Sequence, residues 1–104
     1  MPASRLTALK DMVAQNPGNS FLRYGLAMEY RNAGDLAGAA EEFRSLMVAD
    51  PDYVAAYFHG GQTLEKLGRE EEAREVYRNG LEAADRKGDH HARAEIAAAL
   101  ELMG

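Results

Sequence analysis

The chain contains no cysteine and no tryptophan, and only three of its 104 residues are proline. Without cysteine it can form no disulfide framework and no thiolate, which fits a reducing compartment. No stretch approaches the roughly 18 apolar residues that a membrane span needs, and the first residues contain no run that resembles a signal peptide. We therefore expect a cytoplasmic protein that does not enter membranes.

An excess of positive charge is also missing. The formal net charge is -5, and the arginines are scattered among glutamates rather than gathered in a basic stripe. Because an acidic surface repels phosphate backbones, we expect no nucleic-acid partner. The adjacent His90 and His91 point to different helix faces, so they do not form the spaced pair of a helical metal site. No catalytic constellation is found, and we expect no enzymatic activity, no metal and no cofactor.

What the sequence does contain is a helical pattern. Apolar residues recur at three- and four-residue spacing almost throughout, and no run alternates like a strand. Glycine and proline, which end helices, divide this pattern at regular intervals. The divided pattern predicts six helices, at 4–15, 20–32, 36–49, 53–66, 70–86 and 89–103. Five residues stand where a side-chain oxygen could cap a helix start: Ser4, Ser20, Asp35, Asp52 and Asp89. Helices this short need a neighbour to cover their apolar face, and the short connections predict antiparallel hairpins.

The same residue types return after 34 positions. Among the aligned pairs are Pro17 with Pro51, Gly34 with Gly68, Ala39 with Ala73, and Phe43 with Tyr77. The first copy reads Arg23, Leu26-Ala27, Tyr30, Ala39, Phe43 and Pro51, and the second reads Tyr57, Gly60-Gly61, Leu64, Ala73 and Tyr77. A helix-turn-helix repeat of this length and pattern resembles the tetratricopeptide repeat family.

The resemblance implies an all-α fold, a right-handed stack of antiparallel helical hairpins (an α-solenoid). It divides the chain into a half repeat at 4–16, repeats at 17–50 and 51–84, and a terminal capping helix at 89–103. The small residues Ala27 and Gly61 would let the two helices of a hairpin approach, and Phe43 and Tyr77 would be buried between hairpins. Arg23, where the family has a large apolar residue, and Gly60, where it has leucine, predict a loosely packed hairpin at 53–84. Gly80 lies inside a predicted helix and costs about 1 kcal/mol relative to alanine.

The resemblance also implies a protein–protein interaction module. In such proteins the first helix of each hairpin lines a concave groove that receives an extended or helical peptide. The residues that we expect to line an apolar-aromatic groove here are Phe21, Tyr24, Met28, Arg31, Phe58, Gln62 and Glu65, with Ala92, Ile96 and Ala99 added by the last helix. Family members that bind the acidic tails of chaperones have lysines and asparagines at these positions, which argues against that ligand.

Two alternatives involve the last helix. Helix 89–103 is apolar around much of its circumference, and only part of that surface can pack on helix 70–86. The remainder either stays exposed on an alanine-rich cap or pairs with a second copy, which would make the protein a homodimer. The same helix could instead fold over Tyr24, Met28 and Phe58 and bury them within the chain.

Overall fold

The computed structural model describes residues 4–104. These residues form six α-helices and no strand: α1 (Arg5–Gln15), α2 (Ser20–Asn32), α3 (Leu36–Ala49), α4 (Val54–Lys66), α5 (Glu70–Lys87) and α6 (His90–Leu102). The predicted boundaries are confirmed to within one residue at each end.

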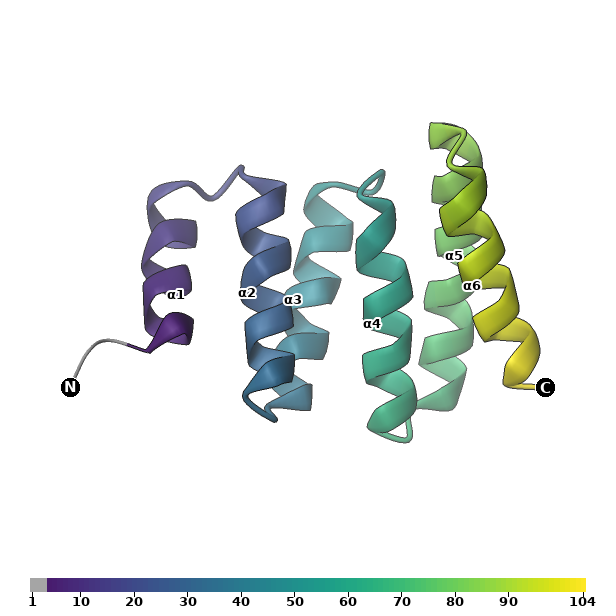
Figure 1. The fold of residues 1–104 in the computed structure, drawn as a ribbon, viewed down its shortest axis with the longest axis horizontal. Coiled ribbons are helices and arrows are strands. Elements are labelled where there is room, and N and C mark those ends of the chain that lie inside the picture. The colour runs from purple at the N-terminus through teal and green to yellow at the C-terminus, as the bar shows by residue number, and fades with distance from the viewer. Residues whose placement is uncertain (1–3) are drawn as a thin grey trace.

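The helices are stacked along one axis. Each packs against the next in the chain, and α4 also contacts α6. Figure 1 shows α2, α4 and α6 in one layer, with α3 and α5 behind them and α1 at the N-terminal end. The stack measures 45 × 28 × 19 Å. The predicted fold class, an all-α stack of antiparallel helical hairpins, is confirmed. The division into repeats at 17–50 and 51–84 stays a prediction.

Side chains cap four of the helix starts. Ser4, Asp35 and Asp89 each accept a backbone N–H hydrogen bond in the first turn, as expected. The prediction for Ser20 was wrong: Asn19 caps α2, because its Oδ1 is the atom that reaches the Leu22 N–H. The Ser20 hydroxyl donates instead to Asp50 Oδ2 at 2.6 Å, which ties the start of α2 to the end of α3.

Asp52 is also not a cap. Tyr53 occupies the position before α4 and makes no side-chain capping bond. The Asp52 carboxylate accepts instead from Arg86 of α5, at 2.8 Å between Oδ1 and Nε. The predicted capping side chain therefore joins the turn before α4 to the last part of α5, through two residues that are 34 positions apart in the sequence.

The core lies between the hairpins. Phe43 and Leu46 of α3 are fully buried among small residues of α2 and α4. Tyr77 of α5 is fully buried in a second cluster, together with Ile96 of α6. The predicted burial of Phe43 and Tyr77 is confirmed. The suggestion that Ile96 lines a groove was wrong, because its side chain is completely enclosed in that core.

Two glycines explain how closely α4 and α5 cross. A Cβ at Gly61 would lie 2.2 Å from Cε1 of Tyr77, and a Cβ at Gly80 would lie 2.6 Å from Cβ of Tyr57. Neither position leaves room for a methyl group, so Gly80 is required by packing despite its poor helix propensity. The loose packing that we expected for this hairpin is not found at the crossing.

Candidate protein-binding surfaces

One candidate surface is formed by α2 and α4 and collects most of the residues expected in the groove. We call it the α2/α4 face and define it by Tyr24, Met28, Arg31, Phe58, His59 and Gln62. All six side chains are partly buried. Tyr24 contacts the rings of Phe43 and Tyr53, with centroids 6.2 and 5.5 Å away. Tyr24 and Met28 also pack against the Phe43 cluster, so they belong partly to this face and partly to the core.

Arg31 is the polar centre of this face. Its guanidinium lies 3.2 Å from Nδ1 of His59 and donates to Oε1 of Gln62 at 3.4 Å. Within residues 4–104 it forms no ion pair with a carboxylate. A cation held by neutral partners keeps donors that can bind an acceptor from outside.

His59 is a member of this cluster that the sequence interpretation missed. Its ring makes edge contacts with Tyr24 and Phe58, at centroid distances of 5.7 and 5.3 Å. Burial lowers the pKa of His59, and the neighbouring Arg31 charge lowers it further, while Glu95 of α6 acts in the opposite direction. The only signal in the sequence was its position, one residue after Phe58 and three before Gln62.

The other expected groove residues lie at the borders of the face. Phe21, in the first turn of α2, is 71% exposed. Glu65, near the end of α4, accepts a hydrogen bond from the Tyr77 hydroxyl at 2.5 Å between Oε2 and the phenol oxygen. Phe58 packs against the core cluster that contains Ile96. The last helix thus covers part of the apolar surface near Phe58.

A second candidate surface lies on the other side of α4. It is a hollow of about 480 Å³ between α3 and α5, with α4 as its floor. The sequence interpretation did not identify it, although it singled out the glycine at its floor. A Cβ at Gly60 would lie 3.3 Å from Cβ of Phe43. The family's leucine is absent at this point, and Gly60 is itself buried in the floor of the hollow, where an added Cβ would press on Phe43.

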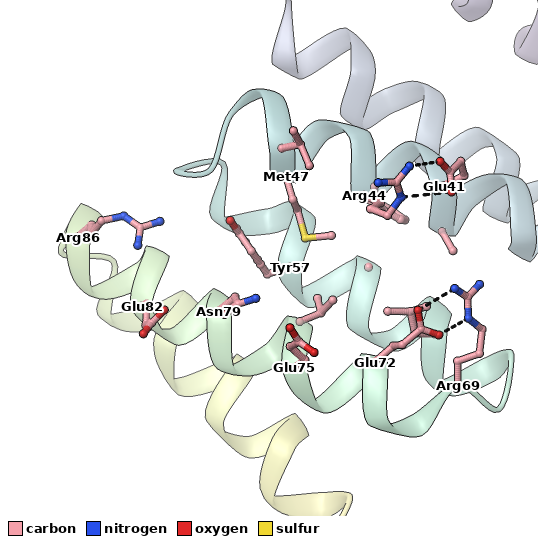
Figure 2. Close-up of a pocket in the computed structure, with 16 residues that line it drawn as sticks. Glu41, Arg44, Met47, Tyr57, Arg69, Glu72, Glu75, Asn79, Glu82 and Arg86 are labelled. Carbon is pink, nitrogen blue, oxygen red and sulfur yellow. Dashed lines mark hydrogen bonds and ion pairs between the residues drawn. The ribbon is translucent and has the colours of Figure 1, made fainter.

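Figure 2 shows the hollow with its apolar floor and charged rim. Arg44 pairs with Glu41 on α3, and Arg69 pairs with Glu72 at the start of α5, where Nη2 and Oε1 are 2.8 Å apart. The lining residues are Ala40, Glu41, Phe43, Arg44, Met47, Val48, Tyr57, Gly60, Leu64, Arg69, Glu72, Glu75, Val76, Asn79, Glu82 and Arg86. We call this site the α3/α5 hollow.

Neither surface offers a metal site in the part of the chain that the structure describes. No group of three or more histidine, aspartate or glutamate side chains within residues 4–104 is placed to hold a metal ion. None of the helices described here is long and apolar enough to cross a membrane.

Comparisons with known proteins agree with this architecture. A tetratricopeptide repeat family model matches residues 54–87. The TPR repeat-containing protein PA0015 of Pseudomonas aeruginosa is 33% identical over 98 residues, which are 94% of this chain and 93% of that protein.

Solved structures of similar proteins extend the comparison. A tetratricopeptide repeat domain protein of Salinibacter ruber is 34% identical, with a TM-score of 0.75, over 79% of this chain and 91% of that one. Protein BPP2914 of Bordetella parapertussis is 29% identical, with a TM-score of 0.79, over 95% of this chain and 86% of that one. Tetratricopeptide repeat proteins are generally protein–protein interaction modules without enzymatic activity. The chain belongs to the tetratricopeptide repeat family.

Proposed function

We propose that the protein holds a peptide or helix of a partner protein on the α2/α4 face. The observation that carries this proposal is the environment of Arg31. Its guanidinium is partly buried beside aromatic rings, and its hydrogen-bonding partners are the neutral side chains of His59 and Gln62. Arginine and tyrosine in partly desolvated positions are the residues that most often dominate binding energy at interfaces.

The chemistry of the face defines the ligand. The exposed edges of Tyr24, Met28 and Phe58 would contact an apolar side chain of the partner. Arg31 would donate to a backbone carbonyl or a carboxylate next to that side chain. Phe21, with 71% of its surface exposed at the start of α2, would extend the apolar contact.

The test is affinity capture from the source lysate by Arg31→Gln and Phe21→Ser, compared with the unmodified protein. We choose these substitutions because Tyr24→Ala and Phe58→Ala would also remove core contacts. Each variant should lose the captured protein while its thermal melting temperature stays within a few degrees. Arg78→Gln, at an exposed position of α5 that belongs to neither candidate surface, is the control and should capture normally. Unchanged capture by Arg31→Gln and Phe21→Ser together would contradict the proposal.

Self-association through α6 is the second candidate. The observation that favours it is Leu102, the last residue of α6, which is 88% exposed while Ile96 on the same helix is fully buried. An apolar side chain left in water at the end of the stack can be covered by a second copy. Light scattering during size-exclusion chromatography should then report a dimer, and Leu102→Glu should convert it to a monomer. A monomer at all concentrations would remove this candidate.

A further inference from the structure

The α3/α5 hollow lies on a different face of α4 from the surface discussed above. Tyr57, Gly60 and Leu64 line the hollow, whereas Phe58 and Gln62 belong to the α2/α4 face. Residues at spacings of three and four share one side of a helix, so these two sets lie on different sides of α4. Two ligands could therefore occupy the two surfaces at the same time.

The floor of the hollow is apolar. Met47 of α3, Tyr57 of α4 and Val76 of α5 line it together with the buried Gly60. Val48, on the α3 side, is 73% exposed. The apolar lining of the hollow can therefore bury an apolar side chain of a ligand.

The charges on the rim are not balanced within the protein. The three arginines are occupied, because Arg44 pairs with Glu41, Arg69 with Glu72, and Arg86 with Asp52. Glu75 and Glu82 of α5 also line the hollow, and neither forms an ion pair with any residue from 4 to 104. Arg86 follows Glu82 by one turn, but its guanidinium is bound to Asp52 and to the Pro51 carbonyl. The charge left available on the rim is therefore negative.

The spacing of the two free carboxylates suggests the form of the ligand. Glu75 and Glu82 are seven residues apart, which is two turns or about 10.5 Å along α5. Figure 2 shows Glu75, Asn79 and Glu82 following one another along α5 at the edge of the hollow. A second helix lying along α5 presents residues i and i+7 at the same interval, with residues i+3 and i+4 between them on the same side.

We propose that the α3/α5 hollow is a second docking site, which takes a cationic amphipathic helix from a partner protein. Lysine or arginine at positions i and i+7 pairs with Glu75 and Glu82, and apolar residues at i+3 and i+4 enter the hollow between α3 and α5. This is the helix-in-groove mode of recognition, with the register set by the two carboxylates. An anionic helix is rejected, because its charges would meet Glu75 and Glu82.

A synthetic peptide tests the proposal directly. The probe is a fluorescently labelled 15-residue alanine-rich helix with lysine at i and i+7 and leucine at i+3 and i+4. Its fluorescence anisotropy should rise with added protein, and replacing both leucines by serine should weaken binding about tenfold or more. Because these changes are made in the peptide, they leave the fold of the protein untouched. Absence of saturable binding by the lysine-leucine peptide would overturn the proposal.

Charge reversal in the protein identifies the site. Glu75→Lys combined with Glu82→Lys should weaken binding of the lysine peptide about tenfold and should allow a glutamate version of the peptide to bind instead. The matched control is Asp11→Lys with Glu101→Lys, which changes the net charge equally at exposed positions away from the hollow. Equal weakening by both double variants would mean that only the overall charge matters, and the proposal would fail.

Two further measurements distinguish the hollow from the α2/α4 face and from a dimer interface. Arg31→Gln, which tests the α2/α4 face, should bind the lysine peptide normally. Loss of binding in that variant would mean that the peptide occupies the α2/α4 face and not the hollow, and it would overturn the proposal. Light scattering should report the same mass for the unmodified protein and for Glu75→Lys with Glu82→Lys. A dimer that this double variant dissociates would assign the hollow to a second copy and would overturn the proposal of a partner helix.

Discussion

The hairpins α2–α3 and α4–α5 contain matching residues 34 positions apart, but their helices approach each other differently. Phe43 and Tyr77 are equivalent and both are fully buried. In the first hairpin, Ala27 packs in the cluster around Phe43 and its methyl group is accommodated. In the second, a methyl group at the equivalent Gly61 would overlap the Tyr77 ring. Each aromatic side chain is thus matched to the small residue that faces it.

The two hairpins also differ in how much of their first helix is enclosed. Only Leu26 and Ala27 are buried in α2, whereas seven residues are buried in α4. The reason is position in the stack, because α4 packs against α3, α5 and α6, while the outer neighbour of α2 is α1, which contributes no buried residue. In a linear array each unit is stabilised by its neighbours, so similar repeats contribute unequally.

The largest loss of stability should come from truncating the two equivalent aromatic residues. Tyr77→Ala and Phe43→Ala should each lower the free energy of unfolding by about 3–5 kcal/mol, since both side chains are fully buried. Val48→Ala, at a position that is 73% exposed, is the control and should change it by less than about 0.5 kcal/mol. Urea unfolding followed by circular dichroism measures all three. An unchanged midpoint for Phe43→Ala would mean that the repeat register is misplaced.

Exchanging the small residues should affect the hairpins unequally. Gly61→Ala should destabilise by about 1–3 kcal/mol, because the new Cβ would lie 2.2 Å from the Tyr77 ring. Ala27→Gly should cost about 1–2 kcal/mol, because it combines the lower helix propensity of glycine with the loss of a buried methyl group. The pair of variants can be compared by thermal melting under identical conditions. If helix propensity alone mattered, Gly61→Ala would be more stable than the unmodified protein. Such a gain in stability would contradict the close crossing of α4 and α5.

Replacing Tyr77 by phenylalanine should cause a smaller loss of stability than the truncations above. Tyr77→Phe should cost about 1 kcal/mol at neutral pH, because it removes the hydrogen bond to Glu65. Burial raises the pKa of Tyr77, and Glu65 raises it further. Above pH 10 the unfolded chain therefore loses this proton before the folded protein does, and stability declines as the pH rises. The decline should be shallower in Tyr77→Phe, and equal slopes in urea titrations would argue against the raised pKa.

The helices and the aromatic core could be predicted from the sequence because they depend on local signals. Apolar spacing and the glycines at the ends locate each helix, and the 34-residue interval aligns Phe43 with Tyr77. The caps were less predictable. Ser20 and Asp52 have suitable side chains, but each is used for a contact between helices instead. Such contacts depend on residues about 30 positions away, which propensity does not describe.

The candidate surfaces were harder to predict for the same reason. Helical spacing brings Tyr24, Arg31, Phe58 and Gln62 to neighbouring positions, but it does not reveal that His59 lies beside Arg31. The α3/α5 hollow depends on Gly60 and on the separation of two helices that are not adjacent in sequence. A glycine in a helix does not show by itself how close its neighbours lie. An added Cβ at Gly61 would overlap the Tyr77 ring at 2.2 Å, whereas one at Gly60, one residue earlier, would lie 3.3 Å from Cβ of Phe43.

The smallest effect that we predict concerns the pH dependence of the α2/α4 face, which the second hairpin shares with the first. The pKa of His59 is lowered by burial and then by Arg31, with Glu95 opposing. The unfolded chain therefore takes up a proton at about pH 6.5 before the folded protein does, so the stability conferred by the neutral imidazole is present above that pH and declines as the pH falls. The difference should stay under about 1 kcal/mol, because the ring is only partly buried and water screens its charge.

Urea unfolding at pH 7.5 and pH 5.0 should show this decline in the unmodified protein and in His90→Gln, whose imidazole is exposed. His59→Gln should show less of it, and an equal decline in His59→Gln would mean that Arg31 and burial do not hold this histidine neutral.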